Sequence, residues 1–522
     1  MRIAKKALFD TLPPEWPVSL LPEIKEAVEK TGEKIVVLDD DPTGTQTVRD
    51  VTVLTRWDVP SLCEVFQEPE PIVYILTNSR SFSLPEAQEI NREIAGRLEQ
   101  ARRITRPPRA FSIISRSDST LRGHFPGEVE ALRDELGKAI DGILVIPFFE
   151  EGGRYTIDDT HYVAEKESLV PAGETEYARD ATFGYRSSDL RQWVAEKSGG
   201  EIKTEEVASI SLETIRKGGP GAVRLSLCRL EKNQVCVVNA ASYRDLEVLV
   251  AGLLQAEAAG VRMICRTAAS FVRVRGGLEP YPLLTAAELC RGTSQAGRPR
   301  ADSRSSERSV EQTALGSLRE VPLSAQGGLI VAGSYIRKSS EQIAAVQALP
   351  GVAGLEVSVE KLLDDNARLA EITRVKDRVD QVIAARQDAL VFTSRRLVTG
   401  GDAAASLAIG RSVSDALVEI VRRLAERPAW IIAKGGITSS DVATKALKIG
   451  RARVIGQILP GVPVWRAGPG SRWPDLVYVV FPGNVGGPGA IVEAIEKLRR
   501  AGESRGAGRR AAGSPPAAGD SG

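Results

Sequence analysis

The most regular feature of the sequence is an apolar run of strand length that ends in a polar or glycine-rich turn. This pattern recurs at IVVLDDDPTGTQ (35–46), IVYILTNSRS (72–81), FSIISRSDSTLRG (111–123), LIVAGSYIRKSS (329–340), LVFTSRR (390–396), WIIAKGGITSSD (430–441) and VYVVFPGNVGG (477–487). Continuous β-branched runs are typical of strands buried on both faces, as in parallel sheets covered by helices. Ligands in such sheets bind beyond the carboxyl ends of the strands. The pattern therefore predicts an α/β enzyme with polar ligands.

Glycine turns in the second half of the chain precede helix patterns. After KGGIT (434–438), residues 442–447 place their apolar side chains on one helical face, and Pro488 suits the first helical position after PGNVGG (482–487). A strand, a glycine turn and a helix N-terminus together present backbone N–H groups to phosphate. Neither a Walker A motif nor a GxGxxG after a strand occurs. Glycines that only allow close packing remain the alternative.

Composition divides the 522 residues into regions. Residues 289–326 are rich in Ser, Arg and Gly and poor in large apolar groups, which predicts a flexible linker. It separates an N-terminal domain (32–288) from a C-terminal domain (327–499), and the low-complexity residues 500–522 are expected to form a disordered tail. The predicted fold is α/β, with two α/β domains that contain mainly parallel sheets.

Global charge and residue usage exclude several classes of function. The formal net charge is +1, so nothing indicates a nucleic-acid or anionic-membrane partner. The five cysteines show no CxxC spacing, and the chain has only two histidines, which disfavours a zinc site. No apolar stretch approaches the length of a membrane helix. We therefore expect a cytoplasmic protein.

Three adjacent carboxylates stand at the first of the predicted strand ends. Asp39, Asp40 and Asp41 precede a Pro-Thr-Gly turn. Because neighbouring carboxylates repel one another, the trio indicates hydrogen bonds to hydroxyl groups, proton acceptance or Mg²⁺ binding. An aspartate that only starts a turn would explain one of the three.

Arginines at the following strand ends complement these carboxylates. Arg80 lies in TNSRS, and SRSDSTLRGHFPGE (115–128) contains Arg116, Asp118 and Arg122. A guanidinium group is a suitable fork for a substrate carboxylate or a transferred phosphoryl group. A single arginine at a strand end is more often structural, but three beside acidic turns favour an anionic, hydroxylated ligand.

The order of these motifs resembles the four-carbon acid sugar kinase family, also known as the YgbK-like or DUF1537 family. DDDPTGTQ, TNSRS, SDSTLRG, the glycine turn at 435–438 and PGNVG occur in the family order. GRYTIDDTHYV (153–163), ETEYARDATFGY (174–185), RTAASFVRVRGG (266–277), GSYIRKSSEQ (333–342) and KGGITSSDVATKAL (434–447) are similar to its longer members. The resemblance spans about residues 32–498.

The resemblance implies a sugar-acid-binding N-terminal domain and a nucleotide-binding C-terminal domain. It places substrate contacts at Asp40, Arg80, Asp118 and Arg122, of which Asp118, Asp40 and Arg122 are the catalytic candidates. It places ATP contacts at Ser334, Gly435, Gly436, Ile437, Thr438 and Gly483. The sequence departs from the family pattern at Arg116, where lysine is usual, at His124, where asparagine is usual, and at Phe481-Pro482, which replaces a Lys-Ser-like pair.

These observations together predict an ATP-dependent kinase that uses Mg²⁺ and phosphorylates a small sugar acid such as threonate or erythronate. Phosphoryl transfer needs a positioned hydroxyl, a base and cations against the phosphate oxygens, and the motifs supply these groups. The metal ligands are unknown, and a homo-oligomer is left open. An ATP-independent isomerase, epimerase or lyase and a non-catalytic metabolite sensor are the alternatives.

Overall fold

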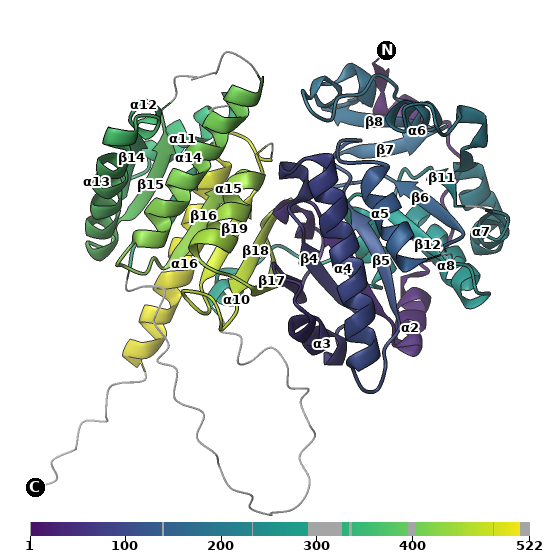
Figure 1. The fold of residues 1–522 in the computed structure, drawn as a ribbon, viewed down its shortest axis with the longest axis horizontal. Coiled ribbons are helices and arrows are strands. Elements are labelled where there is room, and N and C mark those ends of the chain that lie inside the picture. Colours follow the sequence, from purple (N-terminus) through teal and green to yellow (C-terminus); the bar gives the residue numbers. More distant parts are fainter. Residues whose placement is uncertain are drawn as a thin grey trace, which may run out of the picture. The chain divides into compact units, whose positions relative to one another are not determined.

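The computed structural model describes residues 2–137, 140–231, 233–290, 326–333, 337–394, 403–483 and 485–511. The chain forms two compact units. The N-terminal unit contains residues 1–282 and 449–463, and the C-terminal unit contains residues 283–448 and 464–522 (Figure 1). Almost all of the predicted linker, 289–326, lies outside the described residues.

The N-terminal unit is built on a sheet in the order β10-β11-β6-β12-β5-β2-β4-β3-β17. Its neighbouring strands are parallel except for β3 and β17, which are antiparallel. The strands are β2 (Lys34–Asp39), β3 (Val51–Leu54), β4 (Ile72–Leu76), β5 (Phe111–Arg116), β6 (Gly142–Ile146), β10 (Ala208–Ile210), β11 (Gln234–Val238), β12 (Met263–Thr267) and β17 (Arg451–Leu459). The central strands coincide with the apolar runs of the sequence because helices cover both faces of the sheet.

Two helical layers enclose this sheet (Figure 1). In one layer α4 packs on α3 and α5, and in the other α8 packs on α2, α7 and α9. The helices are α1 (Lys5–Phe9), α2 (Leu21–Thr31), α3 (Val59–Gln67), α4 (Leu84–Ile104), α5 (Gly127–Leu136), α6 (Leu190–Lys197), α7 (Leu212–Leu227), α8 (Tyr243–Ala258) and α9 (Ala269–Arg275). The core between the sheet and the first layer includes Leu38, Ile75, Phe66, Leu98 and Leu132, all of which are buried.

A small antiparallel sheet combines three strands that follow β6 in the chain with one strand from the N-terminus. Its order is β1-β9-β8-β7, with β1 (Ile3–Ala4), β7 (Arg154–Ile157), β8 (Thr160–Glu165) and β9 (Ser168–Pro171). Two 3₁₀ turns come next, η3 (Ala172–Glu174) and η4 (Glu176–Arg179). Tyr185, just beyond them, donates its hydroxyl hydrogen to the carbonyl of Thr120 at 2.9 Å. This segment is therefore attached to the loop that follows β5.

The C-terminal unit has a sheet in the order β18-β19-β16-β13-β15-β14. Only β18 is antiparallel to its neighbour. The strands are β13 (Leu329–Ala332), β14 (Val352–Val357), β15 (Asp388–Thr393), β16 (Trp430–Lys434), β18 (Val462–Ala467) and β19 (Val477–Phe481). The helices are α10 (Ala286–Cys290), α11 (Arg337–Gln347), α12 (Val359–Leu362), α13 (Asp365–Ala384), α14 (Ala403–Arg423), α15 (Gly436–Asp441) and α16 (Ala490–Ala511). A π-helical turn, Val442–Ala446, continues α15.

The fold class is as predicted, and two boundaries differ from the sequence-based division. Residues 449–463 lie with the N-terminal unit instead of inside the predicted 327–499 domain, because β17 pairs with β3 and Arg453 pairs with Glu70 at 3.2 Å. Helix α16 continues to Ala511, although a tail was predicted from residue 500. Ala501 is fully buried in this helix, and its carbonyl accepts a hydrogen bond from the Cys290 thiol.

Candidate functional site

Four adjacent parallel strands bring the predicted N-terminal motifs to one edge of the sheet. In the order β12-β5-β2-β4, Arg266 lies opposite Ser115, and Arg116 lies opposite Asp39. The turn that carries Arg80 follows β4 directly. Because carboxyl ends of parallel strands share an edge, segments separated by more than 200 residues form one cluster of charged side chains.

Each member of the aspartate trio has its own positive or N–H partner. Arg80 forms a two-pronged ion pair with Asp40, with Nε–Oδ2 and Nη2–Oδ1 distances of 2.8 and 2.5 Å. Arg116 Nε donates to Asp39 Oδ1 at 2.9 Å, and the Thr43 N–H donates to Asp41 Oδ1 at 2.9 Å. The mutual repulsion that we expected from the sequence is therefore offset locally.

The three carboxyl groups differ in their ionisation. Burial raises the pKa of Asp39 to about 7, although Arg116 acts in the opposite direction. Asp39 Oδ2 has no hydrogen-bond partner among the described residues. Burial would also raise the pKa of Asp41, but Arg80 and the hydrogen bonds from Thr43 hold it below its ordinary value. The buried cluster thus contains one carboxyl that can hold a proton near neutral pH beside carboxylates fixed by cations.

Asp118 organises the loop after β5. Its Oδ2 accepts the N–H of Thr120 and its Oδ1 accepts the N–H of Leu121, both at 3.1 Å. Arg266 Nη1 donates to the same Oδ1 at 2.7 Å, and the side chains of both ion-pair partners are 1% exposed. Thr120 and Leu121 have φ values of 57° and 64°, which are uncommon for residues with side chains. The carboxylate therefore fixes a loop conformation that the backbone alone disfavours.

Arg266 is the first of the site residues that the sequence did not predict. Its Nη2 also donates to the carbonyls of Ser117 and Arg122, at 3.4 and 3.1 Å. Its guanidinium carbon lies 5.0 Å from the ring centroid of Trp193. The sequence did contain a signal, since an arginine inside the apolar run MICRT is costly to bury without an anionic partner.

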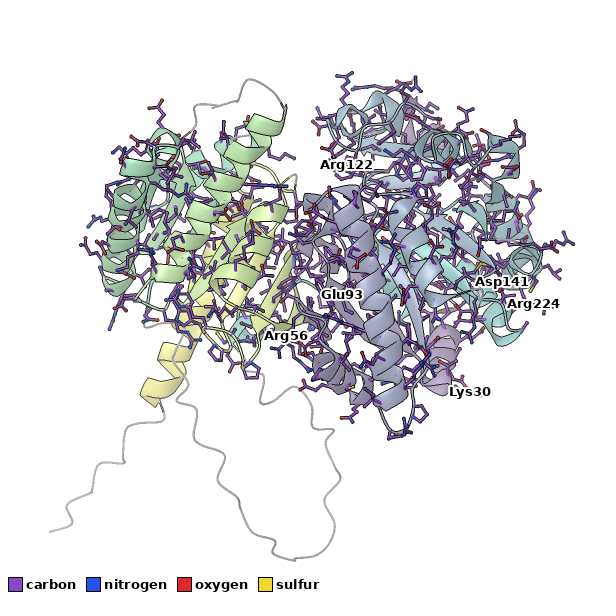
Figure 2. The ribbon with its side chains drawn as sticks, viewed as in Figure 1. Lys30, Arg56, Glu93, Arg122, Asp141 and Arg224 are labelled. Carbon is purple, nitrogen blue, oxygen red and sulfur yellow. The ribbon has the colours of Figure 1, made fainter. Side chains whose placement is uncertain are left out.

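Arg122 projects from this loop toward the segment after β9. Its Nε donates to the carbonyl of Ser119 at 3.0 Å, and its Nη1 pairs with Asp180 Oδ2 at 3.1 Å. Its side chain is 21% exposed, similar to the 20% of Arg80. Figure 2 labels Arg122 at the end of the unit where β7 and β8 lie. These two arginines are accessible to a ligand, whereas Asp118 is enclosed.

A second buried carboxyl, not anticipated from the sequence, lies beside Arg80. Ser79 Oγ donates to Glu128 Oε1 at 2.5 Å, and no residue in the described part of the chain gives Glu128 Oε2 a hydrogen bond. Burial and then the charge of Asp40 raise the pKa of Glu128 to about 7. His124, four residues earlier, is placed against the carbonyl of Phe82, and burial lowers its pKa. Both residues come from the motif RGHFPGE, in which only Arg122 was predicted to function.

Three glycine turns follow adjacent strands in the C-terminal unit. Gly333 follows β13, the 435–438 turn follows β16, and Gly483 lies two residues beyond β19. The strands β13, β16 and β19 are neighbours, so these turns share one sheet edge. Gly435 has φ 100°, and a β-carbon built at Gly435 or at Gly483 would have no described atom within 4 Å, apart from its chain neighbours. Backbone N–H groups in such open glycine turns suit phosphate.

The predicted ATP contacts fall unevenly on the described residues. Gly435, Gly436, Ile437 and Thr438 form the end of β16 and the start of α15, and the Ile437 side chain is exposed. Ser334 lies outside the described residues. The turn beyond Gly483 is held from α11, because Gln342 Nε2 donates to the carbonyls of Val485 and Gly487, at 3.1 and 3.0 Å.

Lys434 connects two of these turns from inside the unit. Its Nζ donates to the carbonyls of Pro482 and Gly483 at 2.7 and 2.8 Å, and the residue is fully buried. Burial lowers the pKa of Lys434 to about 7. A lysine at a strand end beside two glycines could either meet a phosphate or be solvated, and the burial of Lys434 excludes the solvated alternative.

The described part of the chain shows neither a clustered metal site nor a membrane-spanning helix. It contains no group of three or more His, Cys, Asp or Glu side chains arranged to hold a metal ion. No helix in the same residues has the length and apolar character that crossing a membrane requires. The predicted Mg²⁺ and the predicted cytoplasmic location stay predictions.

Comparisons with known proteins assign both units. Residues 35–275 match the sugar-binding N-terminal domain family, and residues 329–491 match the nucleotide-binding C-terminal domain family. The chain belongs to the four-carbon acid sugar kinase family. The predicted architecture of this family, a sugar-binding N-terminal domain followed by a nucleotide-binding C-terminal domain, is confirmed.

Individual relatives are distant. A D-erythronate kinase from Heliobacterium modesticaldum is 24% identical over 226 residues, which cover 42% of this chain and 47% of that enzyme, so the match spans about half of its length. A Salmonella typhimurium LT2 structure, provisionally named a tRNA synthase, aligns with a TM-score of 0.58 at 19% identity over 88% of this chain and 98% of that one. A Haemophilus influenzae protein of the DUF1537 family aligns with a TM-score of 0.54 at 17% identity over 89% and 99%. These two structures establish the fold alone.

Proposed function

We propose that this chain is an ATP-dependent kinase that phosphorylates a hydroxyl group of a small sugar acid, with four-carbon acids such as erythronate or threonate as the first candidates. The observation that carries the proposal is that one chain contains both a sheet edge with charged side chains and a sheet edge with open glycine turns. The sugar-binding unit presents Arg80 and Arg122 beside paired aspartates, and the nucleotide-binding unit presents open glycine turns. The named activity of the D-erythronate kinase relative supports the same reaction class.

The proposal divides the N-terminal side chains by their accessibility. Arg80 and Arg122 are partly exposed and form charge-assisted hydrogen bonds with the reactants: Arg80 orients the acid, and Arg122 orients the acid or stabilises the transferred phosphoryl group. Asp40 pairs with the exposed Arg80, so a substrate hydroxyl can replace one prong of that ion pair and donate its proton to the carboxylate. Asp118 already accepts three hydrogen bonds in the interior, and its proposed contribution is to position the loop that carries Arg122.

The nucleotide is proposed to bind at the glycine turns. The backbone N–H of Gly435 already donates to the carbonyl of Phe481 at 2.8 Å, so the N–H groups at 436–438 and the turn at Gly483 would receive the ATP phosphates, with Gly435 shaping the turn. Ser334 remains a proposed contact. Mg²⁺ would neutralise the phosphate oxygens, and Mg²⁺ typically binds through phosphates and water as well as carboxylates. We assign it no protein ligand.

The first experiment is a panel of C4–C6 sugar acids with Mg·ATP, read by ADP release and phosphorus NMR. At least one acid is expected to stimulate ADP formation and to yield a phosphate ester. If no acid raises ADP formation above the rate without substrate, the kinase proposal fails. Thermal stabilisation by ATP without turnover would indicate a sensor, and acid turnover without ATP would indicate an isomerase or lyase.

The residue assignments are tested on the same samples. Asp40→Asn is expected to lower kcat by roughly 10²- to 10⁴-fold while ATP affinity changes little. Asp134→Asn, an exposed aspartate on α5, is the matched control and should leave kinetics unchanged. Gly436→Val should abolish nucleotide binding, whereas Gly470→Val, at an exposed glycine with open space around it, should not. Circular dichroism establishes that each variant is folded.

A further inference from the structure

Arg154, in the N-terminal unit, forms no ion pair with a described carboxylate. It begins β7, and its Nε donates to Thr120 Oγ1 at 3.1 Å. Its guanidinium carbon lies 5.0 Å from the ring centroid of Tyr177, and the residue is partly exposed. Among the residues that the structure describes, no carboxylate lies within ion-pair distance of Arg154.

The other arginines around this sheet edge differ in that respect. Arg80 pairs with an aspartate, as do Arg116, Arg122 and Arg266. The contacts that hold Arg154 use only its Nε–H and the flat face of the guanidinium, which lies over the Tyr177 ring. Its Nη1 and Nη2 groups therefore donate to no described acceptor. A guanidinium that is fixed in place while its outer donors are unused is suited to receive an anion from outside the protein.

The position of Arg154 indicates which anion it would receive. Tyr177 is shared with Arg122, whose guanidinium carbon also lies 5.0 Å from the ring centroid. Thr120, which fixes Arg154, belongs to the loop organised by Asp118. Arg154 is therefore joined through two residues to the proposed sugar-acid site, although it comes from a different sheet.

We propose that Arg154 binds the carboxylate of the sugar-acid substrate and makes the site selective for acids over neutral sugars. This inference rests on the proposed function, because it names a residue for the acid of that reaction. Tyr177 restrains the plane of the guanidinium, and Thr120 fixes its Nε, so Nη1 and Nη2 can meet the two carboxylate oxygens. Arg122 is left to act nearer the transferred phosphoryl group, with Asp180 holding its orientation.

The test compares an acid with its own neutral amide in the full chain. Arg154→Gln is expected to raise the KM for the active acid roughly 10- to 100-fold, because a charge-assisted contact to the carboxylate is lost. The KM for ATP and the kcat should stay within about threefold of wild type. Affinity for the neutral amide, measured as substrate or competitive inhibitor, should not change, so the acid-to-amide preference falls by the same factor. Arg154→Lys should recover part of the preference, since it restores a charge but not the two-pronged geometry.

The matched control is Arg179→Gln, an exposed arginine in the same η4 turn as Tyr177, which should leave the acid-to-amide preference unchanged. The inference is overturned if the KM for the acid is unchanged in folded Arg154→Gln. It is also overturned if the affinities for acid and amide fall equally and the melting temperature falls with them. If wild type phosphorylates no acid, the proposed function fails, and Arg154 is judged by calorimetric titration of erythronate. If erythronate then binds to wild type but not to Arg154→Gln, the carboxylate contact is supported. If erythronate binds equally to both proteins, or does not bind to wild type, the inference is refuted.

Discussion

The ion pair between Arg266 and Asp118 offers the sharpest test of how the N-terminal site is built. We predict that Arg266→Met destabilises the carboxyl ends of β5 and β12 by about 3–5 kcal/mol, the usual effect of removing one partner of a buried ion pair. Methionine keeps an apolar side chain of similar length but removes the guanidinium, whose carbon lies 5.3 and 5.0 Å from the ring centroids of Phe125 and Trp193. The Asp118 charge is then left without its cation. The carbonyls of Ser117 and Arg122 lose donors as well.

A double-mutant cycle separates the ion pair from these other losses. Asp118→Asn keeps an acceptor for the loop N–H groups but removes the charge, so it leaves Arg266 buried without an anion. In Asp118→Asn/Arg266→Met neither charge remains. We therefore expect the double variant to lose about 2 kcal/mol less than the sum of the two single variants.

Hydrogen exchange measured by mass spectrometry is the appropriate assay, because a chain with two units need not unfold in one step. In Arg266→Met, amides of β5 and β12 should exchange at least roughly 100-fold faster, while strands of the C-terminal unit should be unaffected. Lys217→Met is the control, since Lys217 and Glu213 form an exposed pair with side chains 62% and 70% accessible. Its effect should stay within about 0.5 kcal/mol.

One result would refute this reasoning. If β5 and β12 exchanged within about threefold of wild type in folded Arg266→Met, the pair would not hold the loop. Asp118 would then be as free to react as Asp40, and its assignment as a positioning residue would be withdrawn.

Three further predictions concern single positions. A β-carbon at Gly44 would lie 2.2 Å from the Arg116 guanidinium, so Gly44→Ala should lower the melting temperature and weaken acid binding, whereas Gly221→Ala, where space is open, should do neither. Because the pKa of Lys434 is lowered to about 7, the unfolded chain binds more protons than the folded chain between pH 7 and about 10.5. The free energy of unfolding should therefore rise over this window by on the order of 5 kcal/mol, and denaturant titrations of Lys434→Met should show no such rise. The pKa of Glu128 is raised to about 7, so between about pH 4.5 and 7 the folded chain binds more protons than the unfolded chain, and the free energy of unfolding should fall as the pH rises. Denaturant titrations of Glu128→Gln should lack this fall. A fall of equal size in that variant would contradict the assignment.

The sequence was sufficient for features encoded over a few neighbouring residues. Strands such as β2 and β16 are continuous apolar runs, so their positions and polar ends could be read directly, and parallel topology then placed Asp40 and Arg80 at one edge. The glycine turns of the second unit were recognised in the same way. These predictions depended only on local periodicity and on the rule that ligands bind at strand ends.

Features that depend on pairing between distant segments were not predictable in this way. Nothing near Asp118 reveals that its cation is Arg266, since the two are 148 residues apart and meet only because β12 lies beside β5. Arg154 and Tyr177 come from a small sheet and a 3₁₀ turn that have no strong apolar period. The antiparallel pairing of β17 with β3 joins residues about 400 positions apart, and no local pattern specifies that partner.

The late position of β17 in the sequence has a consequence for how the protein is made. The sheet that carries Asp40 and Arg80 ends at β3 until residues 451–459 have been synthesised. At ordinary translation rates of about 5–20 residues per second, roughly 10–30 s pass between completion of residue 282 and arrival of this strand. During that interval the apolar edge Val51–Leu54 offers unpaired backbone groups to any other nascent chain. A fragment that stops before residue 449 keeps this open edge permanently, so the sugar-binding unit should be soluble only when the whole chain, or a supplied β17 segment, closes it.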